Sequence, residues 1–69
     1  MKNAAERFVA TVTDEDGETI EYGCAPDGAG GRGLFKDAGG RWQQVEGLKD
    51  TPWFRDASEF AAYCRARHD

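Results

Sequence analysis

Apolar and polar residues alternate along two segments in the first third of the chain. Residues 8–13 read Phe-Val-Ala-Thr-Val-Thr, and residues 19–24 carry Ile20, Tyr22 and Cys24 at every second position. Alternation with a period of two, in segments rich in β-branched residues, is typical of strands that bury one face. We therefore predict two strands here.

The residues between these strands predict a hairpin with a three-residue loop. Asp16-Gly17 is a turn signal. A two-residue loop would set apolar positions against polar ones, whereas the loop Glu15-Asp16-Gly17 keeps the apolar residues on one face. The longer loop also puts Gly17 where a left-handed backbone conformation costs least. The pairs expected from it are Val12 with Ile20, Ala10 with Tyr22, and Phe8 with Cys24.

The middle of the chain predicts a flexible loop and a second hairpin. Residues 25–33 are rich in glycine and proline, which interrupt regular structure. Residues 28–33 also match the letters of the dinucleotide motif GxGxxG, but that motif needs a helix after it, and the residues that follow are typical of a strand. The second hairpin joins residues 33–36 to residues 41–45. A four-residue loop would pair Phe35 with Trp42, and shorter loops leave the register open.

The last third of the chain has the spacing of a helix. Asp56 and Glu59 have the spacing of a capping box, and apolar residues follow at helical intervals, including Phe60 and Cys64. Before this helix, Thr51-Pro52 predicts a single helical turn over residues 52–54. Trp53 and Phe54 are the aromatic residues that we expect to be partly exposed, because two neighbours rarely both face inward.

These elements predict a single α+β domain over residues 1–69. We expect a small antiparallel sheet of three to four strands, formed by two hairpins, with the C-terminal helix packed on one face. The expected core is Phe8, Val12, Ile20, Tyr22, Phe35, Trp42, Phe60 and Cys64.

Length and composition exclude several classes of function. A chain of 69 residues buries only about 60% of the surface that it exposes when unfolded, which leaves no volume for a deep active-site cleft. The sole histidine, His68, lies next to the C-terminus, and Cys64 lies on the apolar stripe, so no nucleophile and base are paired. No apolar run approaches the ~20 residues of a membrane helix. We therefore expect neither an enzyme nor a membrane protein, and no cofactor.

The two cysteines leave three alternatives open. Residues 1–7 have no apolar stretch of the kind a secretion signal needs, so we expect a cytoplasmic protein with reduced, buried thiols at Cys24 and Cys64. A disulfide between them would staple a small domain. A metal could use Cys64, His68 and Cys24, but no Cys-x-x-Cys pair is present, so we expect no metal.

The net charge of −4 is unevenly distributed. Residues 1–31 hold seven acids and two bases, a net charge of −5, whereas residues 32–69 carry +1. Most of these acids lie in or next to the loop of the first predicted hairpin. That acidic end is either a solvated tip that resists aggregation or a docking surface for a basic partner. The residues of the predicted docking surface are Asp14, Glu15, Asp16, Glu18 and Glu21.

In size, acidity and hairpin carboxylates the chain resembles the small single-domain inhibitors encoded by phages and mobile elements, including anti-CRISPR proteins. The resemblance implies a stoichiometric inhibitor without a cofactor that occupies a partner's surface. We therefore expect a monomer that binds a basic protein or nucleoprotein, such as a CRISPR effector complex, and does not bind nucleic acid directly. The alternative is a nucleic-acid-binding module that uses the basic residues of 32–67, chiefly Arg32, Lys36, Arg41 and Lys49 around Trp42.

Overall fold

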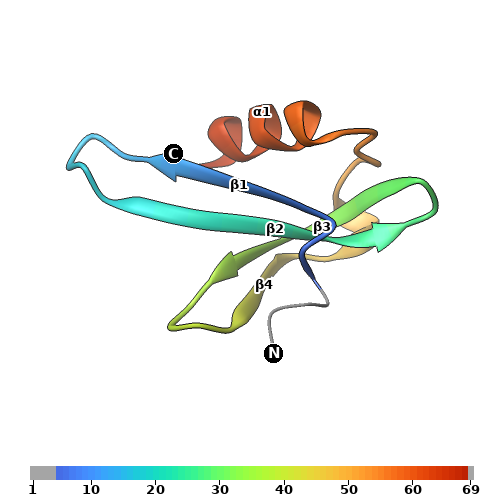
Figure 1. The fold of residues 1–69 in the computed structure, drawn as a ribbon, viewed down its shortest axis with the longest axis horizontal. Coiled ribbons are helices and arrows are strands. Elements are labelled where there is room, and N and C mark those ends of the chain that lie inside the picture. Colours follow the sequence, from blue (N-terminus) through green and yellow to red (C-terminus); the bar gives the residue numbers. More distant parts are fainter. Residues whose placement is uncertain (1–4, 69) are drawn as a thin grey trace.

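The computed structural model describes residues 5–68 as a four-stranded sheet with one α-helix (Figure 1). The sheet is antiparallel throughout, with the strands in chain order. The α-helix packs on one face, so the predicted α+β architecture is confirmed. The elements are β1 (Phe8–Thr13), β2 (Thr19–Asp27), β3 (Gly30–Asp37), β4 (Trp42–Glu46), the 3-10 helix η2 (Leu48–Asp50) and α1 (Ala57–Arg67).

The first hairpin has the predicted register. Val12 pairs with Ile20, Ala10 with Tyr22, and Phe8 with Cys24. Gly17 has a φ of 83°, in the left-handed region that favours glycine, as the three-residue loop requires. Burial of one face fixes this register, because a shift by one residue would turn the apolar side chains to solvent.

The predicted loop over residues 25–33 is wrong, because most of it belongs to strands. β2 continues to Asp27 and β3 begins at Gly30, so only residues 28–29 form the turn. The glycines here permit close packing. A Cβ on Gly30 would lie 2.0 Å from the backbone oxygen of Phe54, and one on Gly31 would lie 2.4 Å from Cys24 Sγ.

The predicted helical turn over residues 52–54 is also wrong. Phe54 instead forms an antiparallel bridge with Gly31, in which the N–H of each residue donates to the carbonyl of the other at 2.8 and 2.9 Å. The nearby 3-10 helix η2 ends at Asp50, before Pro52. Trp53 is 41% exposed, as expected, but the expected exposure of Phe54 is wrong, because its side chain is buried in the core.

The core lies between the sheet and α1. Two predicted core residues, Phe8 and Ile20, are partly buried and pack against it. Phe35 and Trp42 are not core residues. Phe35 pairs with Gly23, whose position on β2 faces away from α1, and Trp42 pairs with Asp37, two positions further along β3 on the same face. The buried cluster is Ala10, Val12, Tyr22, Cys24, Leu34, Phe54, Phe60 and Cys64.

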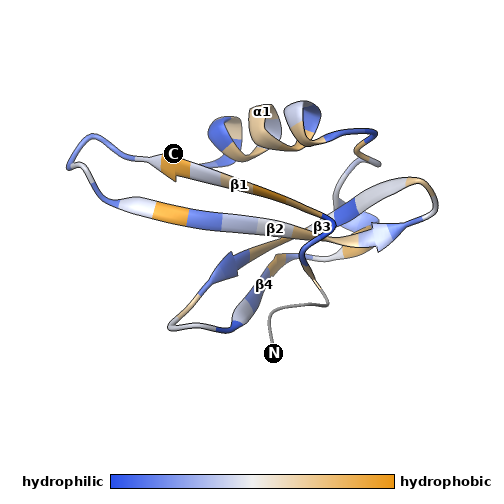
Figure 2. Ribbon diagram, in the orientation of Figure 1, coloured by the Kyte–Doolittle hydropathy of each residue, from blue (hydrophilic) through white to orange (hydrophobic). Residues whose placement is uncertain are grey.

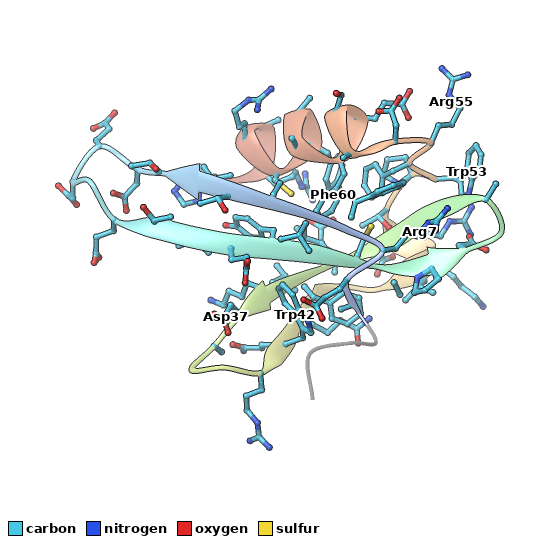
Figure 3. The ribbon with its side chains drawn as sticks, viewed as in Figure 1. Arg7, Asp37, Trp42, Trp53, Arg55 and Phe60 are labelled. Carbon is cyan, nitrogen blue, oxygen red and sulfur yellow. The ribbon has the colours of Figure 1, made fainter. Side chains whose placement is uncertain are left out.

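Trp42 covers the second face of the sheet. Its ring lies against Gly23, where a Cβ would meet the ring at 2.9 Å. Figure 3 shows the indole on the side of the sheet away from α1. The predicted pairing of Phe35 with Trp42 is wrong, because the four-residue loop comprises residues 38–41, so that Trp42 pairs with Asp37 and Phe35 with Gln44.

The capping box that begins α1 is confirmed. The N–H of Glu59 donates to Asp56 Oδ1 at 2.9 Å, and Glu59 Oε1 in turn accepts from the N–H of Arg55 at 2.9 Å. The buried residues of the helix are Phe60 and Cys64. Phe60 packs edge-to-face on Phe54, with ring centroids 5.1 Å apart. Among residues 5–68, no helix is long and apolar enough to cross a membrane.

Glu46 connects α1 to the end of β4. Tyr63 donates its hydroxyl hydrogen to Glu46 Oε1 at 2.6 Å, and Arg67 Nε donates to Oε2 at 2.8 Å. The carboxylate is 17% exposed. The hydrogen bond from Tyr63, supported by Arg67 and opposed by burial, holds the pKa of Glu46 below its ordinary value of 4.5.

The substitution Glu46→Gln is expected to lower the free energy of unfolding by about 1 kcal/mol at pH 7. Because folding lowers the pKa of Glu46, the wild type has this advantage above pH 4.5 and loses it as the pH falls through the folded-state value. Urea unfolding of both proteins between pH 7 and pH 3 measures the difference. A difference that stays constant over this range would show that the ionised carboxylate contributes nothing.

Cys24 and Cys64 are free thiols with no exposed surface, as expected for reduced cysteines. Burial raises the pKa of Cys64 to about 12, and the neighbouring Cys24 adds to the shift. Burial also raises the pKa of Cys24. Both groups are therefore protonated near neutral pH. Among residues 5–68, no group of three or more potential metal ligands is brought together.

Candidate docking surface

The acidic turn, residues 14–18, lies at the end of the β1–β2 hairpin and extends past α1 and the other strands (Figure 1). Glu15, Asp16 and Glu18 are exposed. The hydropathy colouring shows a hydrophilic turn directly beyond the apolar part of β1 (Figure 2). Figure 3 shows several side chains that end in oxygen atoms, drawn in red, at this end of the hairpin. Four of the five predicted docking residues therefore lie together at a protruding end, and three of them are exposed.

Asp14 organises the turn from within. Its Oδ1 accepts hydrogen bonds from the N–H groups of Asp16 at 3.0 Å and Glu18 at 2.8 Å. The backbone closes the same turn, because Asp14 N–H donates to the carbonyl of Glu18 at 2.8 Å and Gly17 N–H to that of Asp14 at 3.1 Å. An aspartate that caps its own turn in this way is a known turn signal, so the sequence contained the evidence for this role.

Glu21 is separated from the acidic turn. It pairs with Thr11 within the sheet and is half-buried. Its position alternates with those of Ile20 and Tyr22, so it faces away from α1. The structure therefore reduces the exposed docking acids to Glu15, Asp16 and Glu18.

The substitution Asp14→Ala is expected to destabilise the hairpin by about 1–2 kcal/mol, because two backbone N–H groups lose their acceptor. Asp14→Asn is the matched control, since the amide oxygen still accepts while the charge is removed. Thermal unfolding of the two variants separates the roles. Equal losses would show that the charge of Asp14, and not its hydrogen bonds, supports the turn.

A groove of about 540 Å³ lies beside the acidic turn. One wall comes from the end of β1 and the turn, and the other from the last residues of α1. The Tyr22 hydroxyl and His68 Nδ1 are 3.0 Å apart, a hydrogen bond that fixes the end of the helix over β2. The groove is lined by Val12, Thr13, Asp14, Glu15, Asp16, Arg65 and His68.

No sequence pattern predicts this groove, because its two walls come from segments near opposite ends of the chain. Arg65 and His68 lie about fifty residues after the acidic turn in the sequence. The fold brings them to the acidic turn because α1 runs along β1 toward the end of the hairpin (Figure 1).

The four basic residues of the nucleic-acid alternative are spread over both ends of β3. Arg32 lies near its start, with Nε 3.4 Å from the carboxylate of Asp27. Lys36 pairs with Tyr22 and shares the helix-covered face, whereas Trp42 covers the opposite face. Arg41 lies in the β3–β4 turn and Lys49 in η2. These cations do not surround Trp42.

Comparisons of the chain with protein-family models, with curated proteins and with solved structures find no significant match. The function is therefore inferred from the geometry of the described residues.

Proposed function

We propose that this protein is an inhibitor that docks its acidic turn on a basic site of a partner protein or nucleoprotein and blocks the site by occupying it. The observation that supports this proposal is the exposure of Glu15, Asp16 and Glu18 on a turn that Asp14 holds in one conformation. The resemblance to phage-encoded inhibitors favours a nucleic-acid-binding site as the target, such as that of a CRISPR effector complex.

Electrostatics favour docking by this end of the molecule. Three carboxylates held close together repel one another, and a partner cation relieves that repulsion. A negative surface also steers a positive partner during diffusional encounter, so association slows as salt screens the charges. A body of 36 × 25 × 18 Å presents this charge at one end of its long axis.

Capture of binding partners from a host lysate tests the proposal with three forms of the intact chain. We expect the wild type to retain a basic protein that is released at 0.5 M salt. The triple variant Glu15→Gln, Asp16→Asn, Glu18→Gln should lose it. The matched control Glu6→Gln, Asp50→Asn removes exposed acids elsewhere and should retain it. Equal capture by the two variants would overturn the proposal.

A gel-shift assay at low salt tests the alternative. We expect the chain alone to leave both DNA and RNA unshifted, because its exposed acids repel phosphates. A shifted complex that is lost in the variant Lys36→Gln, Arg41→Gln would instead support direct nucleic-acid binding.

A further inference from the structure

The groove beside the acidic turn has the shape and polarity of a receptor for a long cationic side chain. Val12, with only 7% of its surface exposed, supplies an apolar lining. Asp14, Glu15 and Asp16 supply carboxylates on one wall. Lysine and arginine side chains bury their methylene stems on apolar surface and keep the charged group at a polar rim, which is the combination that this groove accommodates.

The two walls are held in place before any ligand binds. Asp14 fixes the turn through two backbone N–H groups, and His68 is connected to Tyr22 on β2. The Tyr22 and His68 rings also meet edge-to-face, with centroids 6.1 Å apart. A preformed groove avoids the entropic cost of ordering its walls on binding.

The charge of the groove favours a cation over an anion. The residues that line the groove include three acids, Asp14, Glu15 and Asp16, one arginine, Arg65, and one histidine, His68. Among residues 5–68, Arg65 is the one arginine or lysine that lines the groove, so its positive charge weakens the attraction for an external cation. Its removal should strengthen the binding of an external cation.

We propose that this groove binds an arginine or lysine side chain of the partner, with its stem over Val12 and its charged group at Glu15 and Asp16. This inference rests on the proposed function and names the part of the partner that the docking end recognises. Glu18 belongs to the acidic turn but does not line the groove. Glu18 contributes to the negative electrostatic potential of the turn, but it does not contact the bound side chain.

Titration of the isotope-labelled intact chain with n-butylguanidinium, followed by NMR, tests the inference without the partner. We expect saturable shifts of the signals of Val12, Thr13 and Arg65, with a dissociation constant in the millimolar range. The neutral isostere n-butylurea should cause none. Binding of both compounds alike, or of neither, would overturn the inference.

Three variants give the same experiment a quantitative control. The double variant Glu15→Gln, Asp16→Asn should weaken guanidinium binding at least fivefold, and Arg65→Gln should strengthen it two- to fivefold. Glu18→Gln should change it less than twofold. An equal effect of Glu18→Gln and of the double variant would show a diffuse field and no side-chain site.

The two proposals fail in different ways. If partner capture depends on the acidic turn but the groove takes no guanidinium, the docking function stands and the side-chain site is wrong. If the groove binds guanidinium but the triple variant captures the partner as well as the wild type does, the site exists and the docking function is wrong.

Discussion

Alanine in place of Phe60 is expected to remove about 3–5 kcal/mol from the free energy of unfolding. The Phe60 side chain has no exposed surface and packs edge-to-face on Phe54, so the substitution leaves a cavity between α1 and the sheet. A domain of 69 residues has a total stability on the order of 3–10 kcal/mol. The variant therefore loses a large fraction of its stability, and urea unfolding followed by tryptophan fluorescence measures the loss.

Two variants serve as controls for this experiment. Phe60→Leu keeps most of the apolar volume and should cost less than half as much. Val45→Ala truncates an apolar side chain that is 47% exposed and should cost below about 0.5 kcal/mol. A loss at Phe60→Ala as small as that at Val45→Ala would contradict the packing of α1 on the sheet.

The parts of the fold that the sequence predicts correctly are determined by neighbouring residues. The register of the first hairpin follows from alternation across a short turn, with Gly17 at the left-handed position. The start of α1 follows from two side chains within one turn. Asp56 accepts a hydrogen bond from the N–H of Glu59, and Glu59 accepts one from the N–H of Arg55. In both cases the residues that decide the structure lie within a few positions of one another.

The errors come from contacts between distant segments. The glycine-rich start of β3 pairs with β2 on one side and is bridged to the distant residue Phe54 through Gly31, and local composition carries no sign of that bridge. Phe35 similarly lies on the outer face because β3 pairs it with Gly23, and Trp42 packs against Gly23 on that face. A glycine allows flexibility and close approach equally, and only the opposing segment decides between them.

The candidate site divides in the same way. The exposed acids of the turn, Glu15, Asp16 and Glu18, lie within four residues of one another, so the sequence alone predicts that they cluster. The groove beside them is not predicted, because Arg65 and His68 reach it only after α1 has packed along β1. The groove therefore exists only because long-range packing places the end of α1 beside the acidic turn.

Gly30→Ala should cost about 3 kcal/mol, near the upper end of what an added methyl group costs in a packed site. The new Cβ would lie 2.0 Å from the backbone oxygen of Phe54 and 3.0 Å from Trp53 Cε2. Backbone cannot move aside as a flexible side chain can, so the strain would break the two hydrogen bonds between Gly31 and Phe54. The hydrogen bond from Trp53 Nε1 to the Asp27 carbonyl, 2.8 Å long, should weaken as well. Urea unfolding measures the first effect and the emission of Trp53 in a Trp42→Phe background reports the second.

Gly28→Ala is the matched control in the adjoining turn. A Cβ there meets nothing within 4 Å, but the backbone has a φ of +61°, so this variant should lose about 1 kcal/mol from backbone strain alone. Gly30 has no positive φ, and its cost comes entirely from the contact with Phe54. If Gly30→Ala costs no more than Gly28→Ala, residues 25–33 are the flexible loop that their composition predicts. A cost several times larger shows that glycine is required at position 30 because the Phe54 segment packs directly against it.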